Sequence, residues 1–235
     1  MSGGITLEAF GVRVAIRADS ADALERVRRR FPYAVTARAE GPVTATFALG
    51  GEEEIDRLEA AVRLTIAEHA PERVFVHAGV VAWNERAIVV PGPSFSGKST
   101  LVAALVRAGA TYYSDEYAVC LDSGAIEPFV KPLELRREGE HAQYAVDVPM
   151  PAHGAMTAGL VIVTRYVAGA AWQPRAISRG AGVLRLLENA VAARSASERA
   201  LRALGAVVSS AIVLEGDRGD ADETAAAMLA RAGAY

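Results

Sequence analysis

The stretch Gly92-Pro93-Ser94-Phe95-Ser96-Gly97-Lys98-Ser99 has the spacing G-x-x-x-x-G-K-[ST], and Thr100 follows it directly. Residues 88–90 before it are apolar, and residues 101–106 after it have the composition of a buried helix. A glycine-rich loop between a strand and a helix is the pattern of a phosphate-binding loop. The two glycines let the chain turn sharply and leave no Cβ in the path of a phosphate. The stretch therefore predicts an α/β fold that binds a nucleoside triphosphate.

Each residue type in this loop has a chemical task. The backbone N–H groups of the loop and of the following helix N-terminus form a cradle for anions, so we expect all of residues 92–100 to contact the nucleotide. Lys98 is expected to place its charge on the β- and γ-phosphates, and Ser99 to offer its hydroxyl to Mg²⁺. Only two of the 25 basic residues are lysine, Lys98 and Lys131. A lysine kept in such an arginine-rich chain indicates a place that the arginine fork does not fit.

Composition excludes several other classes of protein. The chain has 235 residues, 51% of them hydrophobic, and a formal net charge of -3, which excludes intrinsic disorder. The near-neutral balance argues against a nucleic-acid partner. The single cysteine, Cys120, cannot form an internal disulfide or supply a thiolate zinc site. Residues 1–10 lack the features of a signal peptide, and residues 148–164 contain prolines and glycines that do not suit a membrane helix. We expect a cytoplasmic protein with no membrane partner.

The periodicity divides the chain into a small N-terminal α/β subdomain, residues 1–71, and a catalytic domain, residues 72–235. In the first part we expect strands over residues 5–16 and 43–49, a helix capped by Ser20, and a helix that begins at residue 55 and ends at Pro71. In the second part, two apolar runs, residues 74–83 and 87–90, are separated only by Asn84-Glu85-Arg86. A crossover helix does not fit there, so the two strands should be antiparallel neighbours, unlike a Rossmann start.

After the loop helix we expect a strand over residues 111–121, a short strand over 126–130 and a polar segment, 136–154, that forms a lid. A buried strand (160–164), a helix (178–193), a helix opened by a capping box of Ser195 and Glu198, a strand (211–214) and a helix (222–232) should complete the chain.

Two large classes of phosphate-loop protein are disfavoured. No N-K-x-D or T-K-x-D follows the loop, which argues against a GTPase, and residues 161–163 lead to Thr164-Arg165-Tyr166 instead of a Walker B carboxylate. The nearest acidic pair after the loop is Asp115-Glu116. An ordinary ATPase motor therefore fits the sequence poorly.

Four segments together resemble the catalytic domain of the HPr kinase/phosphorylase family, and more narrowly the shorter HPr-kinase-related phosphate-loop kinases. They are the loop itself and three further segments: His77-Ala78-Gly79-Val80-Val81, Ser114-Asp115-Glu116 and Pro132-Leu133-Glu134-Leu135-Arg136. The resemblance implies an α/β domain of the HPr-kinase/PEP-carboxykinase type with a mixed sheet. The sequence departs from the family at Arg137, where the family has glycine, and at Phe95, where the family usually has a small residue.

The resemblance also implies roles for individual residues. Asp115 matches the catalytic aspartate that takes the proton from an acceptor hydroxyl. Glu116 and Glu134 match positions associated with the metal, Arg136 matches the family's arginine, and His77 matches a histidine close to the phosphates. Each has a plain structural alternative: a solvated strand end for the acidic pair, an exposed ion pair for Glu134 and Arg136, and a buried histidine for His77.

These observations predict an ATP- and Mg²⁺-dependent kinase that transfers the γ-phosphoryl group to a hydroxyl, with a serine of a protein or peptide as the first choice of acceptor. Two alternatives stay open: a small-molecule kinase with the same machinery, and a nucleotide-binding regulator without enzymatic activity. Lys131 either contacts the nucleotide or the acceptor, or it is an ordinary solvated lysine in a loop. The sequence leaves the acceptor, the preference for adenine or guanine, and homo-oligomer formation open.

Overall fold

The computed structural model describes residues 3–37, 41–50, 54–136, 143–146, 148 and 154–233. The chain divides into two compact units, Met1–Arg73 and Val74–Tyr235. The periodicity of the sequence predicts this division after residue 71. The chain is a mixed α/β protein, as expected.

The first unit is a four-stranded sheet with the strand order β3-β1-β2-β4, accompanied by two helices. The single strand expected over residues 5–16 is wrong: the segment is a hairpin that turns at Phe10 and Gly11, both with positive φ. Ser20 caps the first helix, as predicted, because its hydroxyl accepts a hydrogen bond from the N–H of Ala23 at 3.1 Å. The elements are β1 (Gly3–Ala9), β2 (Val12–Ala18), α1 (Ala21–Arg30), β3 (Val35–Ala37), β4 (Ala45–Leu49) and α2 (Ile55–His69).

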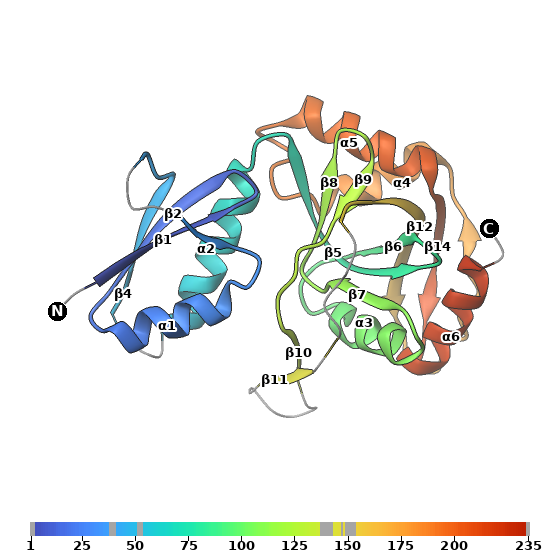
Figure 1. Ribbon diagram of the computed structural model, residues 1–235. Coiled ribbons are helices and arrows are strands. Elements are labelled where there is room, and N and C mark those ends of the chain that lie inside the picture. The colour runs from blue at the N-terminus through green and yellow to red at the C-terminus, as the bar shows by residue number, and fades with distance from the viewer. Residues whose placement is uncertain are drawn as a thin grey trace. The chain divides into compact units, whose positions relative to one another are not determined.

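The second unit is built on a mixed sheet with the strand order β13-β14-β12-β6-β5-β8-β9, and β7 pairs with β5 (Figure 1). β6, β12 and β14 are parallel, so their carboxyl ends lie at one edge of the sheet. Its elements are β5 (Arg73–Trp83), β6 (Arg86–Pro91), α3 (Lys98–Arg107), β7 (Thr111–Ser114), β8 (Tyr117–Leu121), β9 (Ala125–Glu127), β10 (Leu133–Arg136), β11 (Gln143–Val146), β12 (Met156–Tyr166), β13 (Arg175–Ala176), α4 (Arg179–Leu187), α5 (Ser197–Ser210), β14 (Ile212–Arg218) and α6 (Ala221–Ala232).

The tight connection between β5 and β6 is confirmed. The two strands are antiparallel, with Val80 opposite Val89, and Asn84 and Glu85 form the turn with φ of 48° and 59°. Positive φ at both central residues is typical of a type I′ hairpin turn, which matches the twist of the strands. The chain therefore enters the phosphate loop from a hairpin.

Three expectations in this unit are wrong. The helix expected over residues 178–193 ends at Leu187, and residues 191–195 form turns. The strand expected over residues 111–121 is broken at Asp115 and Glu116 into β7 and β8. The capping box of Ser195 and Glu198 does not form, because α5 begins at Ser197 and the hydroxyl of Ser195 donates to the carbonyl of Ala192 at 3.3 Å.

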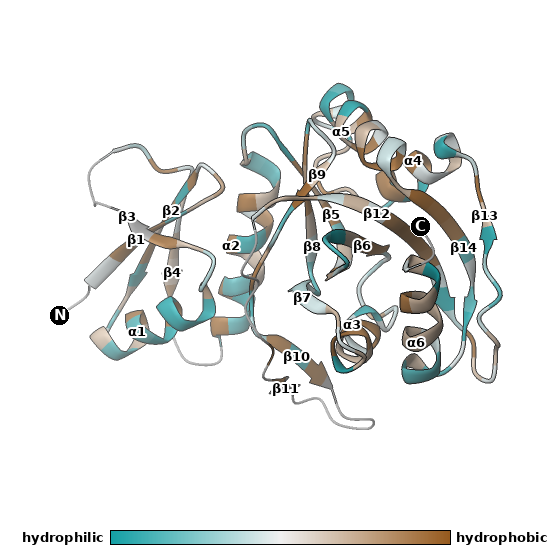
Figure 2. Ribbon diagram, turned by 45° about the vertical axis from the view of Figure 1, so that its right-hand side comes forward, coloured by the Kyte–Doolittle hydropathy of each residue, from teal (hydrophilic) through white to brown (hydrophobic). Residues whose placement is uncertain are grey.

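Helices cover both faces of the central sheet (Figure 1). One buried apolar cluster joins the sheet to α4 and α5, with Leu186 and Leu204 among its members. The other joins the sheet to α3 and α6, with Leu101 and Met228 among its members. The middle of both β6 and β12 is apolar and buried, at residues 87–90 and 160–162 (Figure 2). The phosphate loop begins directly after this buried part of β6.

The segment expected to be a polar lid, residues 136–154, is described only in part. β10 and β11 form an antiparallel pair, with Leu133 opposite Val146. Residues 137–142, 147 and 149–153 lie outside the described part of the chain. Within the described ranges, no helix is long and apolar enough to cross a membrane.

Candidate phosphate-binding site

The glycine-rich stretch is a tight loop between the end of β6 and the start of α3. The N–H of Gly92 donates to the carbonyl of His77 at 3.1 Å, which ties the start of the loop to β5. Gly97 has φ of 80° and precedes the first residue of α3. A Cβ on Gly97 would lie 2.6 Å from a guanidinium nitrogen of Arg218, so glycine is required here by both conformation and space. The loop therefore has the tight geometry that a phosphate cradle needs.

Lys98 points back over the loop. Its Nζ donates to the carbonyl of Pro93 at 2.7 Å. Burial lowers the pKa of Lys98 below its ordinary value of 10.5, while the charges of Glu116 and then Asp115 act in the opposite direction. The ammonium group thus lies between the loop backbone and the acidic pair, in the position from which it can meet a bound phosphate.

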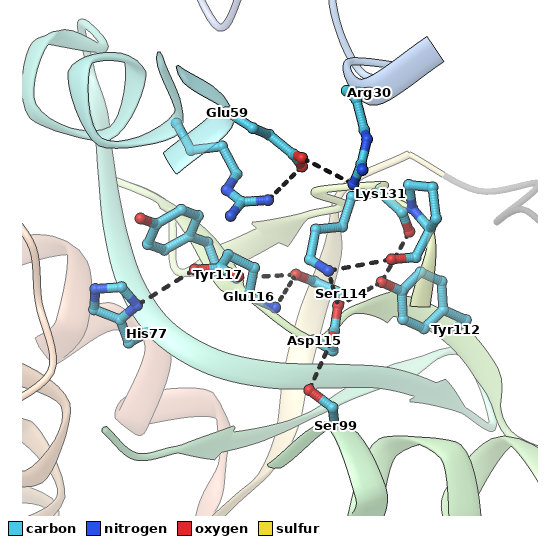
Figure 3. A network of polar contacts seen from close by, with 12 residues as sticks. Arg30, Glu59, His77, Ser99, Tyr112, Ser114, Asp115, Glu116, Tyr117 and Lys131 are labelled. Carbon is cyan, nitrogen blue, oxygen red and sulfur yellow. Dashed lines mark hydrogen bonds and ion pairs between the residues drawn. The ribbon is translucent and has the colours of Figure 1, made fainter. Parts of the chain in front are cut away.

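Asp115 is the centre of a buried polar cluster made of Asp115, Ser99, Tyr112 and Lys131 (Figure 3). The hydroxyl of Ser99 donates to Asp115 Oδ2 at 2.7 Å, and the hydroxyl of Tyr112 donates to Oδ1 at 2.9 Å. The ammonium of Lys131 lies 3.1 Å from Oδ1, and the side chains of Lys131 and Asp115 are only 6% and 4% exposed. Both carboxylate oxygens are therefore occupied by donors.

Tyr112 supports this cluster from within the core. Its hydroxyl lies 2.9 Å from Asp115 Oδ1 and 3.1 Å from the carbonyl of Lys131. Burial and the neighbouring Asp115 charge raise the pKa of Tyr112 far above its ordinary value. The phenol stays protonated at all physiological pH values and acts as a permanent donor.

The break between β7 and β8 is what brings the acidic pair to the loop. Ser114 is fully buried, and its hydroxyl accepts hydrogen bonds from the N–H groups of Glu116 at 3.0 Å and Tyr117 at 2.9 Å. The carbonyl of Glu116 accepts from the N–H of Ala78 at 3.1 Å. A serine that bonds backbone groups two and three residues onward stabilises a turn. Ser114 therefore fixes the bend that presents Asp115 to Ser99.

His77 lies beside the second carboxylate. Its Nδ1 is 4.0 Å from Glu116 Oε1, and its ring packs on Tyr117 with ring centroids 4.8 Å apart. Its own backbone bridges two elements, since its N–H donates to Asn189 at 2.8 Å and its carbonyl accepts from Gly92. The side chain of His77 is partly exposed and faces Glu116 (Figure 3).

Two expected site residues, Glu134 and Arg136, come from β10. Glu134 is half-buried there. Arg136 ends β10, and its side chain lies outside the described part of the chain. The structure brings together Lys98, Ser99, Asp115 and Glu116, with His77 at the edge.

Arg218, which the sequence analysis did not single out, contacts the loop directly. It is almost fully buried at the end of β14, donates to the carbonyl of Gly97 at 3.0 Å, and lies over the ring of Tyr166. Desolvation by burial lowers its pKa from the ordinary value. Its position depends on β14 lying one strand beyond β12, and no local sequence pattern gives that order.

The oxygen atoms at this site suit Mg²⁺. Among the described residues, no three His, Cys, Asp or Glu side chains come together as a metal site. Mg²⁺ does not require such a cage, because it keeps several waters and binds through one or two protein oxygens and substrate phosphates. The Ser99 hydroxyl and the Asp115 carboxylate, 2.7 Å apart, are hard oxygen donors of this kind.

Comparisons with known proteins find a distant resemblance to solved structures. The sequence matches no protein-family model and none of the curated proteins. Among solved structures, the chain is similar to the Hpr(Ser) kinase/phosphatase from Coxiella burnetii, with a TM-score of 0.37 and 12% identity over 68% of this chain and 95% of that one. At this level of likeness we base the proposals below on the geometry of the loop and its neighbours.

Proposed function

We propose that this protein is a kinase that binds MgATP in the loop of residues 92–99 and transfers the γ-phosphoryl group to a hydroxyl. The observation that carries the proposal is the 2.7 Å contact between the Ser99 hydroxyl and Asp115 Oδ2, directly after a loop of phosphate-binding sequence. A phosphate-loop serine next to a carboxylate is the pair that holds Mg²⁺ in proteins that use such loops. The mixed α/β unit of residues 74–235 is proposed to be of the HPr-kinase type.

The geometry supports a different division of roles from the one that the family resemblance implied. Asp115 is already engaged by three donors, Ser99, Tyr112 and Lys131, which suits a fixed carboxylate on the metal side. Glu116 is partly exposed, with His77 Nδ1 4.0 Å from its Oε1 and the charge of Lys98 also acting on it, so its carboxylate is accessible to an acceptor. We therefore assign the metal-side role to Asp115 and the role of base to Glu116.

The proposed reaction is an in-line displacement. The acceptor oxygen forms a bond to the γ-phosphorus, the bond from that phosphorus to the β–γ bridging oxygen breaks, and ADP leaves. The hydroxyl proton passes to Glu116, while Lys98 stays against the β- and γ-phosphates. Bound Mg²⁺ would neutralise charge on the phosphate oxygens. The contribution of the chain is mainly position and electrostatics, as phosphoryl transfer requires.

The acceptor is proposed to be a serine of a protein or peptide, with a small-molecule alcohol as the alternative. The test is incubation of the protein with Mg²⁺ and γ-labelled ATP, in one arm with serine peptides and in another with pooled small alcohols. Label that enters either acceptor with wild type, and not with Lys98→Ala, supports the kinase and identifies its acceptor class. Tight MgATP binding with no transfer in any arm favours a regulator without enzymatic activity.

Titration with Mg²⁺ separates the metal side of the site from the proposed base. We expect Ser99→Ala to need more Mg²⁺ than wild type and to regain part of its activity when Mg²⁺ is raised. Glu116→Gln should stay at least about a hundredfold slower in kcat at any Mg²⁺ concentration, because a positioned base contributes roughly 10²–10⁴ in rate. Rescue of Glu116→Gln by metal would reverse these roles.

A further inference from the structure

A cavity of about 540 Å³ opens beside the phosphate loop and has no role in the site described so far. One wall is the loop itself, at Pro93, Ser96 and Gly97, and the opposite wall is the end of β12, at Thr164 and Arg165. The cavity is therefore continuous with the proposed phosphate cradle.

Two aromatic side chains stand at this cavity, Phe95 on the loop and Tyr166 at the end of β12. They are 84% and 56% exposed, whereas six of the nine other phenylalanine and tyrosine side chains that the structure describes are buried. Phe95 also has φ of 65°, a backbone conformation that a bulky residue rarely adopts. The loop therefore presents a solvent-exposed aromatic ring at a conformational cost of order 1 kcal/mol or more, and strain of this kind is concentrated at binding sites.

The topology indicates which end of a nucleotide would lie here. β5 and β7, and with them Asp115 and Lys131, are on one side of β6, whereas β12 and β14 are on the other. The carboxylate and Ser99 mark the side of the metal and the terminal phosphate. An extended nucleoside triphosphate held by the loop must then direct its nucleoside toward the carboxyl end of β12, where the cavity lies.

The β12 wall of the cavity is held in place by Arg218, which contacts both Tyr166 and the loop. The guanidinium of Arg218 lies 5.5 Å from the centroid of the Tyr166 ring, and the same group donates to the carbonyl of Gly97 at 3.0 Å. One buried arginine thus connects the aromatic wall to the loop. A base that stacked on Tyr166 would meet a ring already fixed relative to the phosphate cradle.

We propose that this cavity binds the nucleobase of the triphosphate, by stacking on Phe95 and Tyr166. This inference rests on the proposed function and adds the position of the base and the residues that hold it. Aromatic stacking accepts any base, because every base has a π-face, so the cavity binds purines without a motif such as N-K-x-D. A second cavity of about 570 Å³ also borders the loop, at Gly92 and Pro93, but none of the described residues that line it is aromatic. A third, at Trp83 and Ala232, lies at the opposite end of β6.

The test compares MgATP with magnesium tripolyphosphate, which has the phosphates and no base. Phe95→Ala and Tyr166→Ala should each weaken MgATP binding at least about fivefold, the effect of losing one base stack, and leave tripolyphosphate binding unchanged. Tyr166→Phe keeps the ring and should bind MgATP as wild type does. Lys98→Ala should weaken the binding of both MgATP and tripolyphosphate, and it therefore tests the phosphate loop separately from the base site.

A fluorescent variant gives a second readout. In Phe95→Trp, MgATP should quench the new indole, and tripolyphosphate should not, since only a base can stack on it; wild type, which has Trp83 and Trp172, serves as the background. MgATP affinity that is unchanged in both alanine variants would overturn the inference. So would an equal loss for both ligands, because the aromatic residues would then act on the loop. Equal affinity of wild type for tripolyphosphate and MgATP would overturn the proposed base site, but it would still be consistent with the phosphate site.

Discussion

Breaking the buried ion pair of Asp115 and Lys131 should strongly destabilise the second unit. The two charges are 3.1 Å apart, and both side chains are more than nine-tenths buried. At an effective dielectric constant of about 20, two unit charges at this separation attract by about 5 kcal/mol. Removing one partner of a buried pair costs about 3–5 kcal/mol, because the other charge is left buried without compensation.

The perturbation is a double-mutant cycle of Asp115→Asn and Lys131→Met. Asparagine keeps the shape of Asp115 and can still accept from Ser99, but it leaves the Lys131 ammonium with only the carbonyl of Pro132, 3.1 Å away. Each single variant should lose about 3 kcal/mol or more, a fall in Tm of about 10 °C for a unit of this size. The double variant carries no unpaired charge and should recover most of the loss.

Urea unfolding followed by circular dichroism gives the three free energies, and a thermal scan gives the Tm values. The account requires a favourable coupling of about 3 kcal/mol between the two positions. An Asp115→Asn variant within about 1 kcal/mol of wild type, or a double variant whose losses simply add, would refute the reasoning.

Three other outcomes are expected. ATP affinity should fall as the pH rises through the pKa of Lys98, which burial places below 10.5, because the neutral amine no longer attracts phosphate; Lys98→Arg stays charged and should show no such fall in titrations at pH 7–10. Gly79→Ala puts a Cβ 2.5 Å from Val102 on α3 and should cost about 1–3 kcal/mol in urea unfolding, and an unchanged midpoint would contradict this contact. Burial raises the pKa of Cys120 to about 12, so native protein should react with a thiol reagent only after denaturation, and rapid labelling at pH 8 would show that the thiol is accessible.

The sequence predicted those features that depend on local pattern. The phosphate loop lies between a strand and a helix because glycine spacing and apolar periodicity are encoded within about twenty residues. The β5–β6 hairpin was predictable for the same reason, since three polar residues between two apolar runs leave no room for a helix. The N-cap at Ser20 was predictable because it depends only on a hydrogen bond within the first turn of α1.

What the sequence did not predict depends on contacts between distant segments. The buried hydroxyl of Ser114 makes the break at Asp115 and Glu116. The apolar residues on both sides of the break predict one continuous strand, so the break was not predicted. The partnership of Asp115 with Lys131 joins positions 16 residues apart, and Arg218 reaches Gly97 across 121 residues. The Ser195–Glu198 spacing matched a capping box, yet Ala196 takes the N-cap position and α5 begins at Ser197.

The central claim is that the loop of residues 92–99 binds MgATP through Lys98, and isothermal titration tests it most directly. Wild type and Lys98→Ala are each titrated with MgATP at pH 7.5 under the same conditions. The account predicts one ATP bound per wild-type chain and at least about a tenfold loss of affinity in Lys98→Ala, about 1.4 kcal/mol for the lost charge on the phosphates. Equal affinity in the two proteins, or no binding by wild type, would contradict it.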